Sequence, residues 1–170
     1  MSWPMGFMNR ICQKLHEEHD GTVALMERLE QLIARHRHQP PEAKDSDVAR
    51  LLSDLWTALE TEVERHFAFE EERLFTYLSG IGEETIGAHL SEEHTAIRPI
   101  GVRIAALARE AAVHGFDSAG WDEFRRRGQE LCERLLTHVQ KEEMALLPLI
   151  EESMDADTEA RLLHDYVETA

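Results

Sequence analysis

Six side chains of this sequence combine residue types and spacings that suit metal chemistry. A histidine is followed by a glutamate four residues later at His66-Phe-Ala-Phe-Glu70 and again at His138-Val-Gln-Lys-Glu142. Residues four apart lie on one face of a helix, so each pair would present an imidazole nitrogen and a carboxylate together. Two more histidines, His19 and His94, each follow a Glu-Glu pair. The six candidate metal ligands are therefore His19, His66, Glu70, His94, His138 and Glu142.

The same residues recur at matching positions in the two halves of the chain. Leu15-His-Glu-Glu-His19 matches Leu90-Ser-Glu-Glu-His94, and the two His-x-x-x-Glu motifs are each followed by a second glutamate, Glu71 or Glu143. Each half thus supplies one lone histidine followed by one His-x-x-x-Glu motif. This internal repeat selects the candidate ligands independently of any argument about helix faces.

Helical periodicity indicates the elements that would carry these residues. Apolar residues recur at spacings of three and four in long segments, which are separated by breaker clusters near residues 39–47, 79–82 and 114–120. We expect helices over about 9–37, 46–78, 83–113 and 121–152, followed by a short C-terminal helix over about 155–167. Nothing alternates as a strand would. The sequence therefore predicts an all-α, antiparallel up-down-up-down four-helix bundle that forms a single domain over residues 1–170.

The candidate ligands interrupt the apolar face of every predicted helix at a similar height. At a rise of about 1.5 Å per residue, His94 lies roughly 29 Å from the third turn, and His138 and Glu142 lie roughly 25 to 32 Å from it. The same calculation from the other turns brings His19, His66 and Glu70 to that layer. We therefore expect all six side chains to converge inside the bundle.

Four nitrogens and two carboxylates suit two metal ions, each bound by two histidines and bridged by Glu70 and Glu142. Coordination positions would stay open for dioxygen, nitric oxide, peroxide or hydroxide. The main alternative is a metal-free network of His–Glu pairs, but it would bury two carboxylates at a cost of several kcal/mol each. A structural zinc site would more often use four ligands that include thiolates.

Several neighbouring side chains are candidates for supporting roles. His16 is either a further ligand or a peripheral partner, and His89 or Glu93 could line an opening one turn away. We expect Glu71 and Glu143 to orient ligand imidazoles or to be solvated. Tyr77 is predicted to lie on the apolar face, where it would be a core residue or a hydrogen-bond donor to the site. Pro99 predicts a kink after His94, because proline removes a helix hydrogen bond.

Composition limits the classes of partner. Acidic residues outnumber basic ones 34 to 18, and the resulting net charge of −16 disfavours nucleic acid and anionic membranes as partners. No apolar run approaches the roughly 20 residues of a membrane span. The amino terminus lacks the features of a signal peptide, so we expect a cytoplasmic protein. Cys12 and Cys132 form no metal or disulfide motif, and we expect both to be free core thiols.

The ordered set of a histidine, His-x-x-x-Glu, a second histidine and a second His-x-x-x-Glu resembles the hemerythrin-like (HHE cation-binding) family over about residues 10–152. The resemblance implies a non-haem di-iron centre, with two iron ions bridged by carboxylates and by an oxo or hydroxo group; zinc or manganese could substitute for iron. Ferritin-like proteins differ, since they use Glu-x-x-His with the glutamate first and a spacing of three.

The chain departs from the oxygen-carrying hemerythrins in two places. Those proteins carry a His-x-x-x-His pair on the third helix, whereas His89 stands five residues before His94. They also use His with an aspartate five residues later on the last helix, where this chain has Glu142. The functional hypotheses are therefore a protein that binds a small ligand (O2, NO or peroxide) and an enzyme or iron donor in nitrosative or oxidative stress repair. A third hypothesis is a metal-free helical interaction module.

Overall fold

The structure, a computed structural model, describes residues 6–168, and that range contains helices and loops but no strand. The first long helix is α1 (Arg10–Arg35), and α5 (Glu84–His114) is the third. The second long helix runs without interruption through α2 (Ser46–Thr57), a π-helical turn (Ala58–Glu62), α3 (Val63–Phe69), a second π-helical turn (Glu70–Leu74) and α4 (Phe75–Gly80). The fourth runs through α6 (Ser118–Lys141), a third π-helical turn (Glu142–Leu146) and α7 (Leu147–Ser153). A shorter helix, α8 (Ala156–Glu168), follows.

Side-chain caps fix where the long helices begin. Asn9 accepts hydrogen bonds from the backbone N–H groups of Ile11 (2.8 Å) and Cys12 (3.1 Å), and Asp45 caps α2 in the same way. Asp117 accepts a hydrogen bond from the N–H of Gly120 at the start of α6. At the other end of α5, Gly115 has φ = 74°, a conformation that glycine adopts without a steric penalty. The predicted breaks therefore end and start helices within a few residues of the expected positions.

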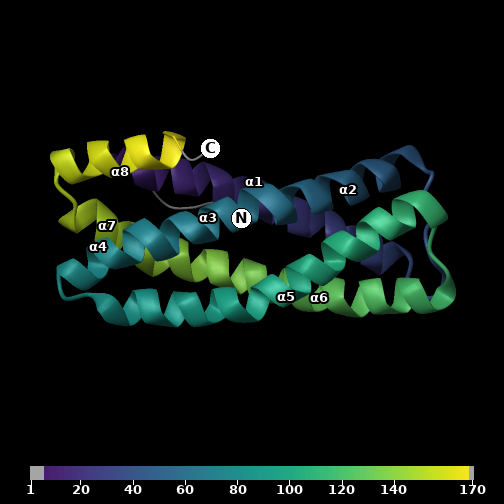
Figure 1. Cartoon of the computed structure of the whole chain (residues 1–170). Helices are drawn as coiled ribbons and strands as arrows, with labels where there is room; N and C mark the ends of the chain where they lie inside the picture. The colour runs from purple at the N-terminus through teal and green to yellow at the C-terminus, as the bar shows by residue number, and fades with distance from the viewer. Residues whose placement is uncertain (1–5, 169–170) are drawn as a thin grey trace.

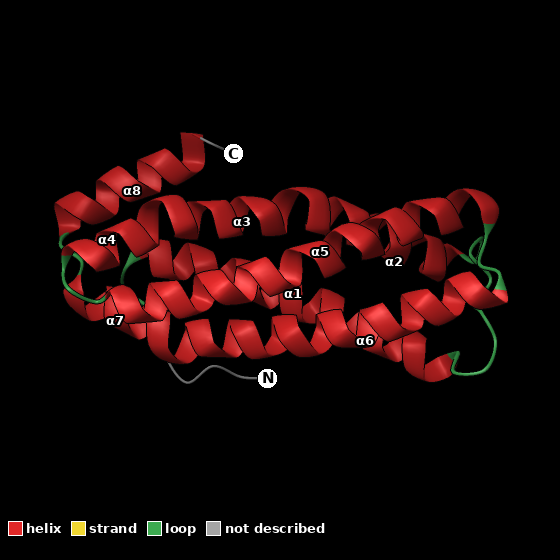
Figure 2. Cartoon of the chain, turned by 60° about the horizontal axis from the view of Figure 1, so that its bottom comes forward, coloured by secondary structure: helices red, strands yellow, loops and turns green. Residues whose placement is uncertain are grey.

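The four long helices form an antiparallel bundle in which each packs against two neighbours. Contacts join α1 with α2, α2 with α5, α5 with α6, and α6 with α1. Figures 1 and 2 show the long helices lying side by side with the loops at the two ends, and α8 turning back along α1. The predicted all-α bundle with a short C-terminal helix is confirmed.

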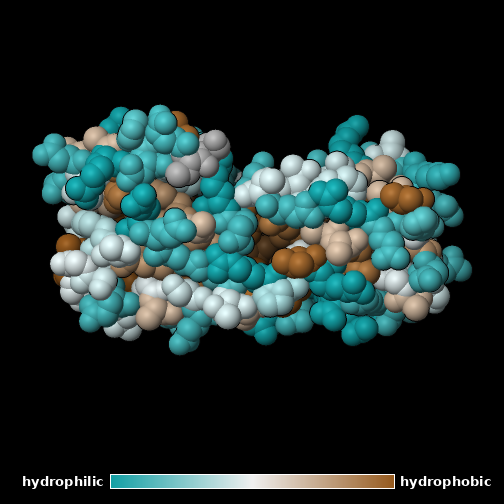
Figure 3. Space-filling model, viewed as in Figure 1, coloured by the Kyte–Doolittle hydropathy of each residue, from teal (hydrophilic) through white to brown (hydrophobic). Residues whose placement is uncertain are grey.

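Two hydrophobic clusters fill the bundle, one on each side of the predicted ligand layer. Leu15 of α1 and Leu90 of α5 belong to the cluster beside α4, α7 and α8, whereas Met26 and Ile104 belong to the cluster at the opposite end. His19 and His94 lie between these positions in the sequence of α1 and α5. Figure 3 shows that the outer surface in this view is mostly hydrophilic, with hydrophobic side chains visible chiefly in hollows. The site layer is therefore a polar region enclosed by apolar packing at both ends.

Because of the π-helical turns, part of the buried face of the second long helix differs from the predicted one. A π turn holds one residue more than an α turn, so the buried positions shift by one residue after it. After Glu70 the buried residues of this helix are Leu74, Phe75 and Leu78, while Tyr77 is only partly buried and its hydroxyl donates to the Ser153 Oγ at 2.9 Å. Tyr77 is therefore not a core residue beside the candidate ligands, and the prediction that it could serve the site is wrong.

Helix α5 carries Pro99 near the middle of its length. Figure 1 shows that α5 changes direction about half-way along, as the missing hydrogen-bond donor of a proline predicts.

Among residues 6–168, no helix combines the length and the apolar character that crossing a membrane requires.

Candidate metal centre

The structure brings the six predicted ligands into one buried layer. His19 comes from α1, His66 from α3, His94 from α5 and His138 from α6. Glu70 and Glu142 are each the first residue of a π-helical turn. The exposed fraction is at most 2% for five of the six residues and 6% for His66. A carboxylate in a bundle core needs a compensating partner, because burying it without one costs several kcal/mol.

The inward-facing atoms form two overlapping groups. One group joins Glu70, His94, His138 and Glu142, with all chosen ligand atoms within 4.8 Å of one another. The second joins His19 and His66 with the same Glu142. Glu142 therefore belongs to both groups. This arrangement is what a bridging carboxylate between two cations requires.

Glu70 also reaches both sides of the layer. Its Oε1 lies 3.2 Å from His94 Nε2, and its Oε2 lies 3.4 Å from His66 Nε2. The Oε1 of Glu142 lies 3.0 Å from His138 Nε2 and 3.4 Å from His19 Nε2. Each glutamate thus contacts one histidine from each half of the chain.

A second set of carboxylates faces the outer nitrogens of the histidines. Glu143 Oε1 lies 3.1 Å from His19 Nδ1, and Glu18 Oε1 lies 2.9 Å from His66 Nδ1. Carboxylates that accept a hydrogen bond from a ligand histidine fix its tautomer and orient its ring. The Nε2 atoms then carry lone pairs directed into the layer.

The second half of the chain repeats these contacts. Glu93 Oε1 lies 2.8 Å from His138 Nδ1, whereas Glu71 Oε1 lies 3.6 Å from His94 Nδ1, which is beyond hydrogen-bond length. Arg98 holds Glu71 in place with two hydrogen bonds of 2.7 Å. Every candidate ligand histidine therefore has a carboxylate near its outer nitrogen, and Glu71 and Glu143 lie in the supporting positions that the sequence suggested.

The charges inside the layer are unbalanced by protein groups alone. All four carboxylate oxygens of Glu70 and Glu142 are buried without a hydrogen-bond partner. The Nε2 atoms of His94 and His138 lie 3.1 Å apart, a contact that is a hydrogen bond only if one of these two nitrogens carries a proton. Cations within the layer would satisfy both the carboxylate oxygens and these nitrogens. The donor set therefore fits metal ions better than it fits a metal-free network.

Shifts in pKa follow from the same geometry. Burial would raise the pKa of Glu70, but the neighbouring His66 and His94 hold that pKa well below its usual range. Burial would lower the pKa of His66, but Glu70 and Glu18 overcome this effect and raise it to about 10. For His138 burial dominates over the attraction of Glu70 and Glu93, and its pKa falls to about 4. The same layer therefore favours a proton on His66 and disfavours one on His138.

Comparison with known proteins agrees with this geometry. A family model described as the hemerythrin HHE cation binding domain matches residues 10–150 and, in a second match, residues 85–168. The chain belongs to the hemerythrin HHE family. The second match begins near the start of α5, where the internal repeat begins again. No curated protein sequence matches the chain.

Membership of the HHE family means that this chain is a cation-binding domain, and the buried His/Glu layer is the group of residues that could hold the cation. Two histidines noted in the sequence lie outside that layer. His16 Nδ1 lies 2.7 Å from Glu143 Oε1, so it contacts a carboxylate that supports His19. His89 is exposed and lies 3.3 Å from Glu93 Oε2. Neither belongs to the two donor groups.

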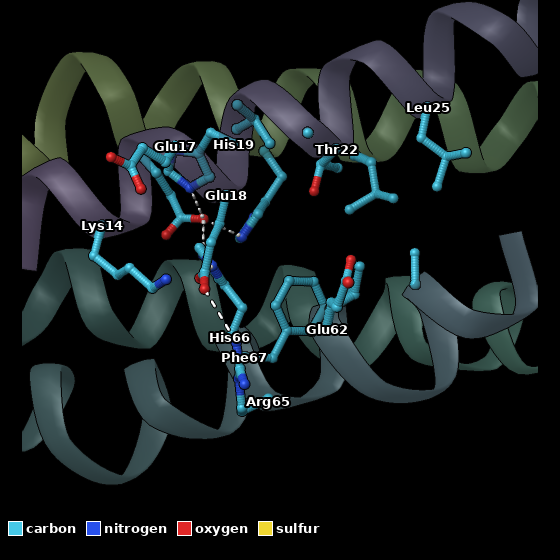
Figure 4. Close-up of a pocket in the computed structure, with 17 residues that line it drawn as sticks. Lys14, Glu17, Glu18, His19, Thr22, Leu25, Glu62, Arg65, His66 and Phe67 are labelled. Carbon is cyan, nitrogen blue, oxygen red and sulfur yellow. Dashed lines mark hydrogen bonds and ion pairs between the residues drawn. The ribbon is translucent and has the colours of Figure 1, made fainter. Parts of the chain in front are cut away.

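A cavity of about 330 Å³ leads to one side of this HHE site. Its lining includes His19, His66, His138 and Glu142 at the inner end and charged residues such as Lys14 at the rim. Figure 4 shows the cavity between α1 and α3, with Glu18 and His66 joined by a hydrogen bond. A small ligand could reach the donor layer from this side.

The internal repeat produces a matching hollow, between α5 and α6, that stops short of the ligands. It is lined by Glu93, Ile97, Glu130, Glu133, Arg134 and Thr137, and by none of the six candidate ligands. Aligning the two halves pairs Thr22 of the open cavity with Ile97 of the hollow between α5 and α6. Phe67, which lines the open cavity, stacks its ring on the His94 ring, with centroids 3.8 Å apart and an interplanar angle of 9°. A larger apolar side chain, Ile97, therefore lines the hollow that does not reach the site.

Sequence reasoning missed two residues of the site. Glu18 accepts from His66 Nδ1 and also receives the hydroxyl of Tyr166. The repeat could have revealed Glu18, because it precedes His19 as Glu93 precedes His94. Nothing in the repeat could have revealed Tyr166, since α8 has no counterpart in the first half of the chain.

Proposed function

We propose that this HHE domain holds two iron ions as a non-haem di-iron centre and that it binds or reacts with a small ligand such as dioxygen, nitric oxide or peroxide. The observation that carries the proposal is the pair of overlapping donor groups that share Glu142, with four buried carboxylate oxygens that have no hydrogen-bond partner. Glu70 and Glu142 would bridge the ions. His19 and His66 would bind one ion, and His94 and His138 would bind the other.

The chain supplies an environment in which such a centre can work. Iron, when bound, would supply redox chemistry and coordination positions for a small ligand. Glu143, Glu18 and Glu93 hold the imidazoles in position through their outer nitrogens. The two hydrophobic clusters exclude water from both ends of the layer. The cavity of about 330 Å³ between α1 and α3 would give a small ligand access to the layer.

Metal content and optical spectra test the proposal directly. Anaerobically reduced, iron-loaded protein should contain two iron ions per chain, and charge-transfer bands in the near-ultraviolet and visible range should appear when air is admitted. A stoichiometric, reversible adduct would indicate a ligand-binding protein, whereas repeated turnover of peroxide or nitric oxide would indicate an enzyme. A protein without stoichiometric iron and with a featureless spectrum would contradict the di-iron proposal; tight binding of zinc or manganese would then assign the site to another metal.

A pair of matched variants tests the ligand assignment. Glu70→Gln keeps the size of the side chain but removes the bridging charge, so the protein should lose most bound metal. Glu72→Gln makes the same change two residues later at an exposed position and should bind metal as the unmodified protein does. Full metal content in Glu70→Gln would remove Glu70 from the ligand set.

A further inference from the structure

The C-terminal helix α8 reaches the candidate metal centre through one side chain. Tyr166 is 3% exposed, and its ring packs against Phe69 with centroids 4.3 Å apart. The guanidinium of Arg65 lies 5.3 Å from the centre of the same ring. These contacts place the Tyr166 hydroxyl at Glu18, to which it donates a hydrogen bond. Helix α8 is therefore connected to α1 and α3 at the height of the site.

Glu18 connects Tyr166 to the candidate ligand His66. Its Oε1 lies 2.9 Å from His66 Nδ1, and its Oε2 lies 3.3 Å from an Arg65 nitrogen. A carboxylate with only His66 as a donor could rotate toward the solvent at the rim of the cavity. With Tyr166 and Arg65 also attached, the carboxylate is held in the orientation that fixes the His66 ring.

The equivalent carboxylate in the second half has a different partner. Glu93 accepts from His138 Nδ1 at 2.8 Å, as Glu18 does from His66, but the ammonium group of Lys141 takes the place of the tyrosine hydroxyl. Lys141 is 41% exposed at its side chain, whereas Tyr166 is buried. The two halves thus offer similar metal ligands but support them differently, one through a helix that lies outside the repeat.

We propose that α8 is a working part of the metal centre and that Tyr166 is a positioning residue for His66, acting through Glu18. This inference rests on the proposed function, because it concerns the ion that His19 and His66 would hold. Without the Tyr166 hydroxyl, Glu18 is less firmly oriented and His66 presents its Nε2 less consistently to the ion. The affinity for one of the two ions then falls, while the affinity for the ion beside His94 and His138 is retained.

Two tyrosine variants of the full-length protein test this inference with Zn²⁺ as the probe. Tyr166→Phe should weaken one of two Zn²⁺ binding steps by about 3- to 10-fold in competition with a chelator, somewhat less than the roughly 10- to 100-fold typical when a residue touching a metal ligand is removed. Tyr77→Phe is the matched control, because it removes a hydroxyl that bonds to Ser153 and touches none of the candidate ligands. It should leave both steps unchanged.

Nuclear magnetic resonance of the histidine rings in the Zn²⁺-loaded protein separates positioning from a general loss of structure. In Tyr166→Phe the ring signals of His66 should shift, while those of His138 should stay in place. Equal weakening of both steps together with shifts at all four histidines would mean that Tyr166 merely stabilises the fold, and would overturn the inference.

The remaining outcomes distinguish the two proposals. If the unmodified protein binds two Zn²⁺ ions and Tyr166→Phe binds them identically, the role of Tyr166 is refuted while the two-metal site stands. If the unmodified protein binds no Zn²⁺ and no iron, the proposed function fails, and the positioning role fails with it.

Discussion

Each candidate ligand histidine in this bundle has a carboxylate near both of its ring nitrogens. The Nε2 atoms face Glu70 and Glu142, and the Nδ1 atoms face outer carboxylates such as Glu143 and Glu93. The sequence could predict the inner set, because histidines and glutamates interrupt an apolar face at equivalent places in both halves. It could not predict which outer carboxylate serves which histidine, since His19 takes Glu143 from the opposite half while His66 takes Glu18 from its own.

The two cysteines allow a prediction about chemical reactivity. Both are free and buried, as expected from the sequence, and burial raises the pKa of Cys12 and of Cys132 to about 12. The thiolate is the reactive form, so both should resist a thiol reagent at mildly alkaline pH until the protein unfolds. Reaction rates measured with and without denaturant would check this. Rapid, stoichiometric labelling of the native protein would show that the thiols are accessible.

At the scale of the elements, the π-helical turns are what sequence periodicity failed to anticipate. Two of them begin at equivalent residues of the repeat, Glu70 and Glu142, and so coincide with the candidate bridging ligands. Such turns often occur at functional sites. Periodicity analysis assumes 3.6 residues per turn throughout, which is why it placed Tyr77 on the buried face in place of Leu78.

Deleting one exposed residue from a π turn should affect the site more than the fold. Without Glu72, the segment from Glu70 to Leu74 can close as an α turn while Leu74 and Leu78 stay in register, so we expect a loss of about 1 to 2 kcal/mol in the free energy of unfolding. The bound metal should fall sharply because Glu70 begins that turn. Metal analysis and thermal unfolding of the same sample would check both expectations.

Deletion of Arg126 provides the contrasting case. This exposed residue lies in a regular stretch of α6, where removing one residue rotates the following helix by about 100° and misplaces its apolar face. That variant should lose far more stability. If the Glu72 deletion is as unstable as the Arg126 deletion, the π turn is needed for folding itself.

The difference between the two hollows of the repeat leads to a prediction about ligand access. Thr22→Ile gives the open cavity the residue that Ile97 contributes on the opposite side, so association of nitric oxide or dioxygen with the iron-loaded protein should slow. Iron content should not change, since Thr22 is not a candidate ligand, and the free energy of unfolding should change by less than about 1 kcal/mol. Stopped-flow spectroscopy would measure the association rate.

Thr76→Ile makes the same substitution at an exposed position of α4 outside the cavity. It should leave the association rate unchanged. Equal rates in Thr22→Ile and in the unmodified protein would mean that ligands reach the centre by another path.

At the scale of the whole molecule, the polar layer lies between two separate apolar clusters. Leu29, Leu55 and Phe124 are fully buried on one side, and Leu15, Leu78 and Leu90 are buried on the other. Length, periodicity and breaker residues were sufficient to predict this architecture. The packing of α8 against α1 was beyond prediction, because its contacts, such as Arg10 with Glu159, join residues far apart in the chain.

Removing bound metal should therefore lower stability without dissolving the helices. With free metal at 100 times its dissociation constant, each bound ion contributes about 2.7 kcal/mol, which corresponds to roughly 5–11 °C per ion in the midpoint of thermal unfolding for a chain of this size. Far-ultraviolet circular dichroism of chelator-treated protein should show nearly unchanged helix content. A largely unfolded metal-free protein would show instead that the two clusters cannot sustain the bundle alone.

The pairing of the two halves bears on the length of polypeptide that such a centre requires. One helical hairpin supplies a lone histidine and one His-x-x-x-Glu motif, and the other hairpin supplies the same set around an approximate dyad. Two copies of a single hairpin, meeting as a symmetric dimer, would therefore present four imidazoles and two carboxylates across their interface. Helix α8 has no counterpart in that symmetric arrangement. By contacting one half only, it would make the two candidate metal positions of the repeated sequence inequivalent.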